Sequence, residues 1–283
     1  MSKLWMVAFV LMGLAAATPV RADEWSKKYT LTGKPELRLD ANDGSVEITS
    51  ADQQTIDARI TTSGWNIGSD VRINESQNGN QVTLEIRVPR GHFHIGWGND
   101  RHSVRIELRV PRQADLDIHT GDGHINSEAV AGRIRLDTGD GHIMVNGLAG
   151  EMRLHTGDGH IEGAKLDGSL DADTGDGRMN VRGRFDVLTL KTGDGSIEAE
   201  AERGSVMKSN WSLRTGDGSI TLRIAEDVGA ELDAHTGDGH VSLDFPVTVS
   251  GRISTSNIRG KLGNGGPELT LRTGDGSIRL ERL

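Results

Sequence analysis

Thr120-Gly121-Asp122-Gly123-His124-Ile125 is the stretch of sequence that decides the fold, because near-copies of it recur along the chain. In each copy Thr-Gly-Asp-Gly is followed by His, Ser or Arg and then by an aliphatic residue or Met. The copies begin at Thr120, Thr138, Thr156, Thr174, Thr192, Thr215, Thr236 and Thr273. The first four steps are each 18 residues long (138 − 120 = 18). Such a period predicts a solenoid, in which a coil buries its apolar face by stacking on its neighbours.

Apolar residues occupy fixed columns relative to the Thr of each copy. Two residues before it stand Ile118, Leu136, Leu154, Ala172, Leu190, Leu213, Ala234 and Leu271. Five residues after it stand Ile125, Ile143, Ile161, Met179, Ile197, Ile220, Val241 and Ile278. A further apolar column lies four residues before the Thr, and polar residues fill the positions between these columns. Since the spacing within a strand is even, the columns are predicted to face inward from β-strands.

Each coil is therefore predicted to contain a strand, the Thr-Gly-Asp-Gly corner, a second strand and a second corner, the last marked by Gly132, Gly150 and Gly168. Successive coils then pair as parallel strands, giving an all-β parallel β-helix, or β-solenoid, of about 18 residues per coil. A right-handed helix is preferred, because parallel crossovers within one sheet are nearly always right-handed. The step from Thr236 to Thr273 is close to two periods, so a divergent coil is expected around residues 253–257.

The region before the repeats also has the pattern of β-strands, without the strict period. Residues 82–88 and 104–110 alternate apolar and polar side chains, which indicates strands with one buried face. Asn42-Asp43-Gly44 is a turn signal and a degenerate first copy of the motif. We expect residues 23–115 to form an irregular β region that caps one end of a solenoid built from residues 116–283.

The first 22 residues resemble a secretory signal peptide. A basic residue, Lys3, precedes an apolar run, and Val20-Arg21-Ala22 is a small-residue cleavage pattern. The sequence therefore predicts an exported protein, periplasmic or extracellular, with no transmembrane segment in the mature chain. The formal net charge of −9 disfavours nucleic acid as a partner. The chain has no cysteine, so stacked strands rather than disulfides must supply its stability.

One loop gathers aromatic and histidine side chains, between the strands predicted at 82–88 and 104–110. Exposed aromatic residues on a loop are a common recognition device. The candidate ligand contacts are His92, Phe93, His94, Trp97, Arg101 and His102. A long hairpin loop without a ligand is the alternative reading.

Stacking in register would align two sets of possible metal ligands. Carboxylates of Asp122, Asp140 and Asp158 would form a ladder at which Ca²⁺ is conceivable. Imidazoles of His124, His142 and His160 would form a second ladder at which Zn²⁺ is conceivable. The competing reading is structural, with each Asp bonding the amides of its own corner and the histidines facing water. The main prediction is that no cofactor or metal is bound.

The sequence offers no localised catalytic cluster. Nearly every acid or base belongs to a recurring column, and no Ser-His-Asp, metalloprotease or phosphate-loop motif is present. We therefore predict a protein without enzymatic activity. The alternative from a different class is a β-helix enzyme that degrades polysaccharides, which would need a pair of carboxylates in a groove.

Alternating strands ending in Val-Pro-Arg (Val88 and Val110), followed by Thr-Gly-Asp-Gly-His-Ile repeats, resemble a bacterial β-strand-repeat family whose members are described as candidate adhesins and whose domain has no known function. The resemblance covers residues 37–283 and implies a β-solenoid at the cell envelope or surface. It supplies no catalytic residues. The sequence thus predicts a binding or scaffold surface, in adhesion or envelope stress, for a glycan polymer or an envelope protein. A purely structural spacer is a further alternative.

Overall fold

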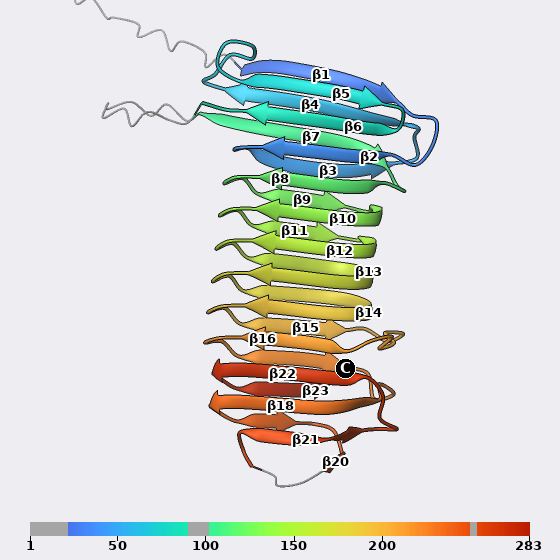
Figure 1. Cartoon of the computed structure of the whole chain (residues 1–283), viewed down its shortest axis with the longest axis vertical. Coiled ribbons are helices and arrows are strands. Elements are labelled where there is room, and N and C mark those ends of the chain that lie inside the picture. The colour runs from blue at the N-terminus through green and yellow to red at the C-terminus, as the bar shows by residue number, and fades with distance from the viewer. Residues whose placement is uncertain (1–21, 90–101, 250–253) are drawn as a thin grey trace, which may run out of the picture.

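The computed structural model describes residues 22–89, 102–249 and 254–283, which contain β-strands and no helix. The strands stack into an elongated, solenoid-like molecule (Figure 1), so the all-β prediction is confirmed. The N-terminal strands are β1 (Ala22–Thr30), β2 (Glu36–Ala41), β3 (Ser45–Ala51), β4 (Thr55–Ser63), β5 (Arg72–Asn78), β6 (Gln81–Arg87) and β7 (Ser103–Pro111).

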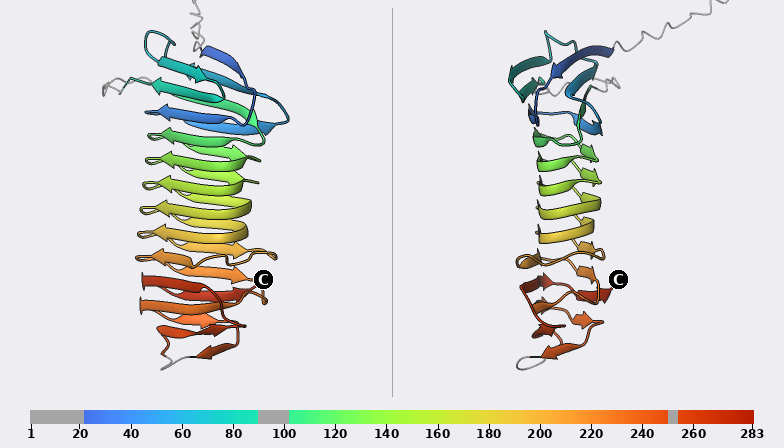
Figure 2. Two further views of the ribbon diagram at one scale, coloured as in Figure 1. Left: turned by 45° about the vertical axis from the view of Figure 1, so that its right-hand side comes forward. Right: turned by 90° about the vertical axis from the view of Figure 1, so that its right-hand side faces the viewer.

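The central strands are β8 (Asp115–Thr120), β9 (Ile125–Glu128), β10 (Ala131–Thr138), β11 (Ile143–Asn146), β12 (Ala149–Thr156), β13 (Ile161–Thr174), β14 (Met179–Thr192), β15 (Ile197–Ala201), β16 (Trp211–Thr215) and β17 (Ile220–Ile224). The C-terminal strands are β18 (Ala230–Asp238), β19 (Val241–Leu243), β20 (Val247–Val249), β21 (Asn257–Leu262), β22 (Glu268–Asp275) and β23 (Ile278–Arg282). Two layers of strands face each other across a thin interior, as the edge-on view in Figure 2 shows.

Equivalent residues of the repeat lie side by side. In the first layer, Thr138 of β10 pairs with Thr120 of β8 and with Thr156 of β12, all in parallel strands. In the second layer, Ile143 of β11 pairs with Ile125 of β9 and Ile161 of β13. The long strands β13 and β14 bend around the second corner and belong to both layers, with register shifts at the bend of β13. Side chains that share a column in the sequence therefore share a row on the molecule.

The interior is formed by the apolar columns, whose members in the parallel coils are buried, except that Val241 is only partly buried. Trp211 and Phe185 are among the largest side chains that are fully buried. The motif threonines are buried too, although their column is polar. The hydroxyl of Thr156, for example, donates a hydrogen bond of 2.7 Å to the carbonyl of Gly141 in the preceding coil.

Close backbone approach explains the second glycine of the motif. A Cβ atom on Gly159 would lie 1.9 Å from the carbonyl oxygen of Gly141, far inside contact distance. At the second corner Gly150 adopts a φ of 109°, which side chains other than glycine rarely tolerate. A Cβ atom on Gly150 would also lie 2.4 Å from the carbonyl oxygen of Gly132, so both the backbone conformation and the close approach require glycine there.

The C-terminal coil does not lie at the end of the stack. Strand β22 pairs in parallel with β16 on one side and with β18 on the other, so that Thr273 lies between Thr215 and Thr236. Likewise β23 lies between β17 and β19, and Figure 1 shows this red segment inside the stack. The prediction of a divergent coil around residues 253–257 was wrong. The chain instead forms β20 and β21, with β21 antiparallel to both β18 and β20.

The N-terminal end has the same arrangement. Strand β2 lies between β6 and β8, and β3 lies between β7 and β9. The Asn42-Asp43-Gly44 corner therefore belongs to the parallel stack, in register with the Thr120 corner, since Ala41 pairs with Thr120. Beyond it, antiparallel pairing of β1 with β4, β4 with β7 and β5 with β6 closes this end. Antiparallel strands thus cap both ends, where open parallel edges would invite association with other chains.

A partly buried carboxylate, that of Asp115, joins three successive coils near the N-terminal end. Burial alone would raise the pKa of Asp115, but hydrogen bonds from the Lys34 ammonium and from the Arg133 backbone and side chain lower it to about 2. Lys34 precedes β2, Asp115 begins β8 and Arg133 lies on β10. The charged form of Asp115 therefore stabilises the contact between the coil that contains β2, which lies between β6 and β8, and the first repeats.

Candidate binding groove

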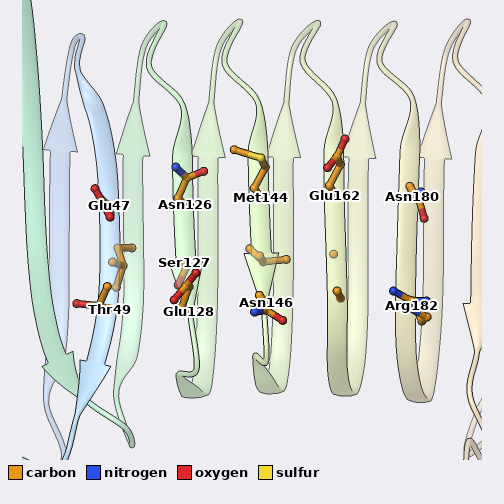
Figure 3. A pocket seen from close by; sticks show the side chains of 14 residues that line it. Glu47, Thr49, Asn126, Ser127, Glu128, Met144, Asn146, Glu162, Asn180 and Arg182 are labelled. Atoms are coloured by element: carbon orange, nitrogen blue, oxygen red, sulfur yellow. The ribbon is translucent and has the colours of Figure 1, made fainter.

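One face of the stack carries a shallow groove. We call the outward surface of β3, β9, β11, β13 and β14 the groove face; Figure 3 shows its side chains from close by. Outward residues alternate with the buried isoleucine column, so one row contains Glu47, Asn126, Met144, Glu162 and Asn180 in neighbouring strands. A second row, two residues further along each strand, includes Thr49, Glu128, Asn146, Ala164 and Arg182. The groove between these side chains has a volume of about 480 Å³.

The groove continues toward the N-terminal cap. A second hollow of about 570 Å³, lined by β1, β3, β4 and β7, shares Glu47 and Thr49 with the first. Together they cross eight neighbouring strands, β1, β4, β7, β3, β9, β11, β13 and β14. At about 4.8 Å per strand the continuous depression is roughly 30 Å long. Its long axis runs along the stack, perpendicular to the strands.

Polar groups in the groove retain unused hydrogen-bonding capacity. The Oδ1 atom of Asn126 is buried and has no hydrogen-bond partner among the described residues. Met144, with 44% of its surface exposed, is the largest apolar side chain exposed in the groove. Buried polar atoms without partners are uncommon in folded proteins and often mark places where another molecule or a water completes the bonding.

The part of the groove on β3, β9, β11, β13 and β14 is acidic, whereas Lys27, Lys28, Arg59 and Arg109 line the hollow near the cap. Glu47 is paired with Arg105 at 3.6 Å, and Arg182 with Glu202 at 4.0 Å. Glu128 and Glu162 form no ion pair within the parts of the chain that the structure describes. The lining therefore presents negative charge and amide groups, with one exposed thioether.

A stack of imidazoles forms the rim of the groove on the Thr-Gly-Asp-Gly side. His124, His142 and His160 lie two residues before Asn126, Met144 and Glu162 on the same face of their strands. Their ring centroids are 4.9 Å apart and their planes are within 9° of parallel. Each Nδ1 accepts a backbone N–H one coil further on, from His142, His160 and Arg178, at 3.0 to 3.1 Å. An Nδ1 atom that accepts leaves the proton on Nε2, so the stack presents Nε2–H donors to solvent.

The same geometry bears on the metal candidates. Neighbouring nitrogens bound to one zinc lie only about 3.4 Å apart, because Zn–N bonds are about 2.0–2.1 Å. The Nδ1 atoms are already engaged, and the 4.9 Å separation of the rings is too long for adjacent histidines to share one ion. Asp122, Asp140 and Asp158 line up at the exposed corners as expected. Among the described residues, no group of at least three His, Cys, Asp or Glu is arranged to hold a metal.

The predicted aromatic loop can be placed only at its last residue. His92, Phe93, His94, Trp97 and Arg101 lie outside the described residues. The imidazole of His102 stacks on Trp65, with ring centroids 5.0 Å apart and an interplanar angle of 27°.

The opposite face, formed by the outward residues of β8, β10, β12 and the second halves of β13 and β14, differs in its charges. Histidines and aspartates alternate along the stack: His119 contacts Asp137 at 2.9 Å, and His155 contacts Asp173 at 3.3 Å. These pairs satisfy one another across neighbouring coils. The two faces are therefore chemically distinct.

Sequence reasoning did not single out the groove residues, because their columns change chemistry from coil to coil. The signal was the outward position directly after each buried isoleucine, where Asn126, Met144, Glu162 and Asn180 follow one another.

Residues 35–281 match the family model described as Toastrack DUF4097. The chain belongs to this family. A comparison with curated proteins finds no match to this Toastrack chain. In the part of the chain that the structure describes, no helix is long and apolar enough to cross a membrane.

Three solved structures are similar to this chain. A candidate adhesin from Parabacteroides merdae is 10% identical to this Toastrack chain, covers 91% of it and 96% of its own length, and has a TM-score of 0.50. A candidate lipid-binding protein from Parabacteroides distasonis is 12% identical, with coverages of 91% and 96% and a TM-score of 0.45. A candidate adhesin from Bacteroides fragilis is 11% identical, with coverages of 92% and 97% and a TM-score of 0.44. At such identities the likeness shows the fold alone.

Proposed function

We propose that this protein is an exported, non-enzymatic binding protein of the cell envelope, whose groove face holds an extended ligand along the axis of the stack. The observation that supports the proposal best is the continuous depression across eight strands, because the strand register repeats its lining positions from coil to coil. A regular row of sites suits a polymer or an extended partner, whose successive units can be held together. Adhesion or a response to envelope stress would both use such a surface.

The proposal includes the architecture and the export of the chain. We infer a right-handed parallel β-helix of 18 residues per coil, which is supported by hydrogen bonds between residues 18 positions apart. The signal peptide would be residues 1–22, followed by the cap-containing region to residue 115 and the repeats. N-terminal sequencing of the protein recovered from periplasm or medium tests the export: a mature chain beginning at Asp23 supports it, and an intact Met1 in the cytoplasm contradicts it.

A binding role is preferred over a polysaccharide-degrading enzyme, because the unpaired groove carboxylates Glu128 of β9 and Glu162 of β13 lie in different rows and are separated by β11. The adhesin and lipid-binding descriptions of the structural neighbours agree with binding but carry no detail to this chain. Release of reducing ends from polysaccharides by the purified protein, lost on replacing one groove carboxylate, would favour the enzyme instead. The absence of binding to any envelope component would leave the structural spacer.

Binding of the purified full-length chain to washed cell-envelope fragments tests the proposal. The wild type should sediment with the fragments, and Met144→Arg, which places a bulky charge in the middle of the groove, should weaken binding by at least about tenfold. Arg135→Ala serves as the matched control, because Arg135 is exposed on β10 on the opposite face. Equal binding by wild type and Met144→Arg would overturn the assignment of the groove.

A further inference from the structure

The chemistry of the groove narrows the class of ligand. We propose that the groove binds a neutral, hydroxyl-rich polysaccharide whose chain lies along the stack axis, with Asn126, Glu128, Asn146 and Glu162 contacting its hydroxyl groups and the His124–His142–His160 stack providing a rail of N–H donors at its rim. This inference rests on the proposed function and specifies its ligand.

The first argument is the match between hydroxyl groups and the lining. A sugar hydroxyl both donates and accepts, so it suits a surface on which donors and acceptors are mixed. The unpaired carboxylates of Glu128 and Glu162 accept, the amides of Asn146 and Asn180 do both, and the Oδ1 atom of Asn126 is a buried acceptor without a partner.

The second argument is the direction of the repeat. Like positions recur along the stack at about 4.8 Å, and the imidazoles recur at 4.9 Å. The Nε2–H groups of the stack therefore form a line of donors parallel to the groove. A linear polymer that lies along this line contacts the imidazole N–H donors on one side and the amide and carboxylate side chains of the groove on the other. A single sugar would use only one step of this array, so affinity should rise with chain length.

Charge in the part of the groove on β9, β11 and β13 disfavours anionic polymers. The corner aspartates Asp122, Asp140 and Asp158 stand beside the imidazole rail, and Glu128 and Glu162 lie in the groove. The part of the groove on β9, β11 and β13 would therefore repel an anionic polysaccharide, a phosphate-bearing polymer or an anionic lipid surface, whereas Lys27, Lys28, Arg59 and Arg109 line the hollow near the cap. Met144 is the single large apolar side chain exposed among the described groove residues, which is too little for a lipid tail or for the apolar centre of a protein interface.

The experiment compares soluble polysaccharides of different charge by isothermal titration calorimetry on the full-length chain. The neutral probes are laminarin, dextran and mannan, the acidic probe is polygalacturonate and the cationic probe is chitosan. At least one neutral probe should bind more tightly than polygalacturonate, with longer oligosaccharides of it binding better than disaccharides. Met144→Arg should lose at least about tenfold in affinity and Asn126→Leu a smaller factor, while Arg135→Ala is unchanged.

The outcomes separate the inference from the proposed function. Tighter binding of polygalacturonate or chitosan than of the neutral probes would overturn the proposed ligand class. The same conclusion follows if no polysaccharide binds while Met144→Arg still abolishes binding to envelope fragments. In both cases the groove remains the binding site. Neutral polysaccharide bound equally by wild type and Met144→Arg overturns both. Circular dichroism of each variant shows that it is folded before its affinity is compared.

Discussion

Replacing Thr156 by Val tests how the corners hold neighbouring coils together. The Thr156 hydroxyl donates to the Gly141 carbonyl at 2.7 Å, lies 3.3 Å from the Gly139 carbonyl, and accepts from the Gly159 N–H at 3.2 Å. Valine has nearly the same shape, so the substitution leaves the packing intact. It removes the hydrogen-bond partner of one buried carbonyl and one buried N–H.

The magnitude follows from these two groups. A buried polar group left without its partner costs about 1–3 kcal/mol, and the gain from a more apolar side chain offsets part of the sum. Thr156→Val should therefore lower the free energy of unfolding by about 2–4 kcal/mol. Thr156→Ser retains the hydroxyl and loses one methyl group, so it should cost only about 1 kcal/mol.

Urea unfolding followed by circular dichroism measures the effect on the whole chain. Hydrogen exchange of the amides near the corner measures it locally, since stacked coils can open piecewise. Thr221→Val is the control, because Thr221 is a partly exposed threonine on β17, away from the corners. If Thr156→Val is as stable as Thr156→Ser, the corner hydroxyls do not stabilise the stack and the reasoning fails.

The remaining predictions concern the glycines, acid stability, zinc and the intercalated coil. Gly159→Ala forces its Cβ to 1.9 Å from the Gly141 carbonyl oxygen and should reduce unfolding free energy by more than about 3 kcal/mol; a stable variant in urea titrations would show that the coils separate freely. Because the pKa of Asp115 is lowered from 3.8 to about 2 on folding, its contribution of about 1–2 kcal/mol is present above pH 4 and lost as the pH falls toward 2. The difference in stability between wild type and Asp115→Asn should therefore disappear over this range, and a constant difference would contradict the assignment. Zinc should leave the Tm of the wild type and of His142→Ala equal to their metal-free values, whereas a rise in the wild type alone would establish a zinc site. Deleting residues 268–282 removes β22 and β23 and should expose four strand edges, those of β16, β17, β18 and β19, so it should lower the Tm by at least about 10 °C and cause self-association in light scattering. A monomer with the original Tm would contradict the position of β22 and β23 inside the stack.

The periodic spacing was sufficient to predict which side chains face inward. Ile125, Leu136 and Leu154 are buried as their columns required, because a strict period fixes both the alternation within a strand and the register between neighbouring coils. The aligned His124, His142 and His160 followed from the same argument.

The order of the coils could not be predicted in this way. The strands of every copy of the motif have similar sequences and therefore similar edges. The sequence alone does not show that Thr273 pairs with Thr215 as well as with Thr236. A gap of about two periods looked like a missing coil, whereas antiparallel strands fill it. The packing of the whole stack decides which equivalent strands pair over long sequence distances. Local sequence patterns contain no information about that packing.

The groove escaped prediction for a different reason. Its lining joins Glu47 to Asn126 and Arg182, residues whose proximity depends on the intercalated β3. The burial of the corner threonines was also missed, since Thr138 and Thr156 form a polar column that gave no sign of facing inward.

Methyl NMR of methionine tests the central claim, that the groove face is the binding surface, without changing the protein. Met144 is 44% exposed in the groove, while Met152 and Met179 are buried in the interior and serve as internal references. With ¹³C-methyl methionine in the full-length chain and Met144→Leu for assignment, the account predicts that the Met144 signal shifts and saturates on titration with laminarin, dextran or mannan while the Met152 and Met179 signals stay in place. A Met144 signal that does not move with any of these probes, at concentrations where calorimetry detects binding, would contradict it.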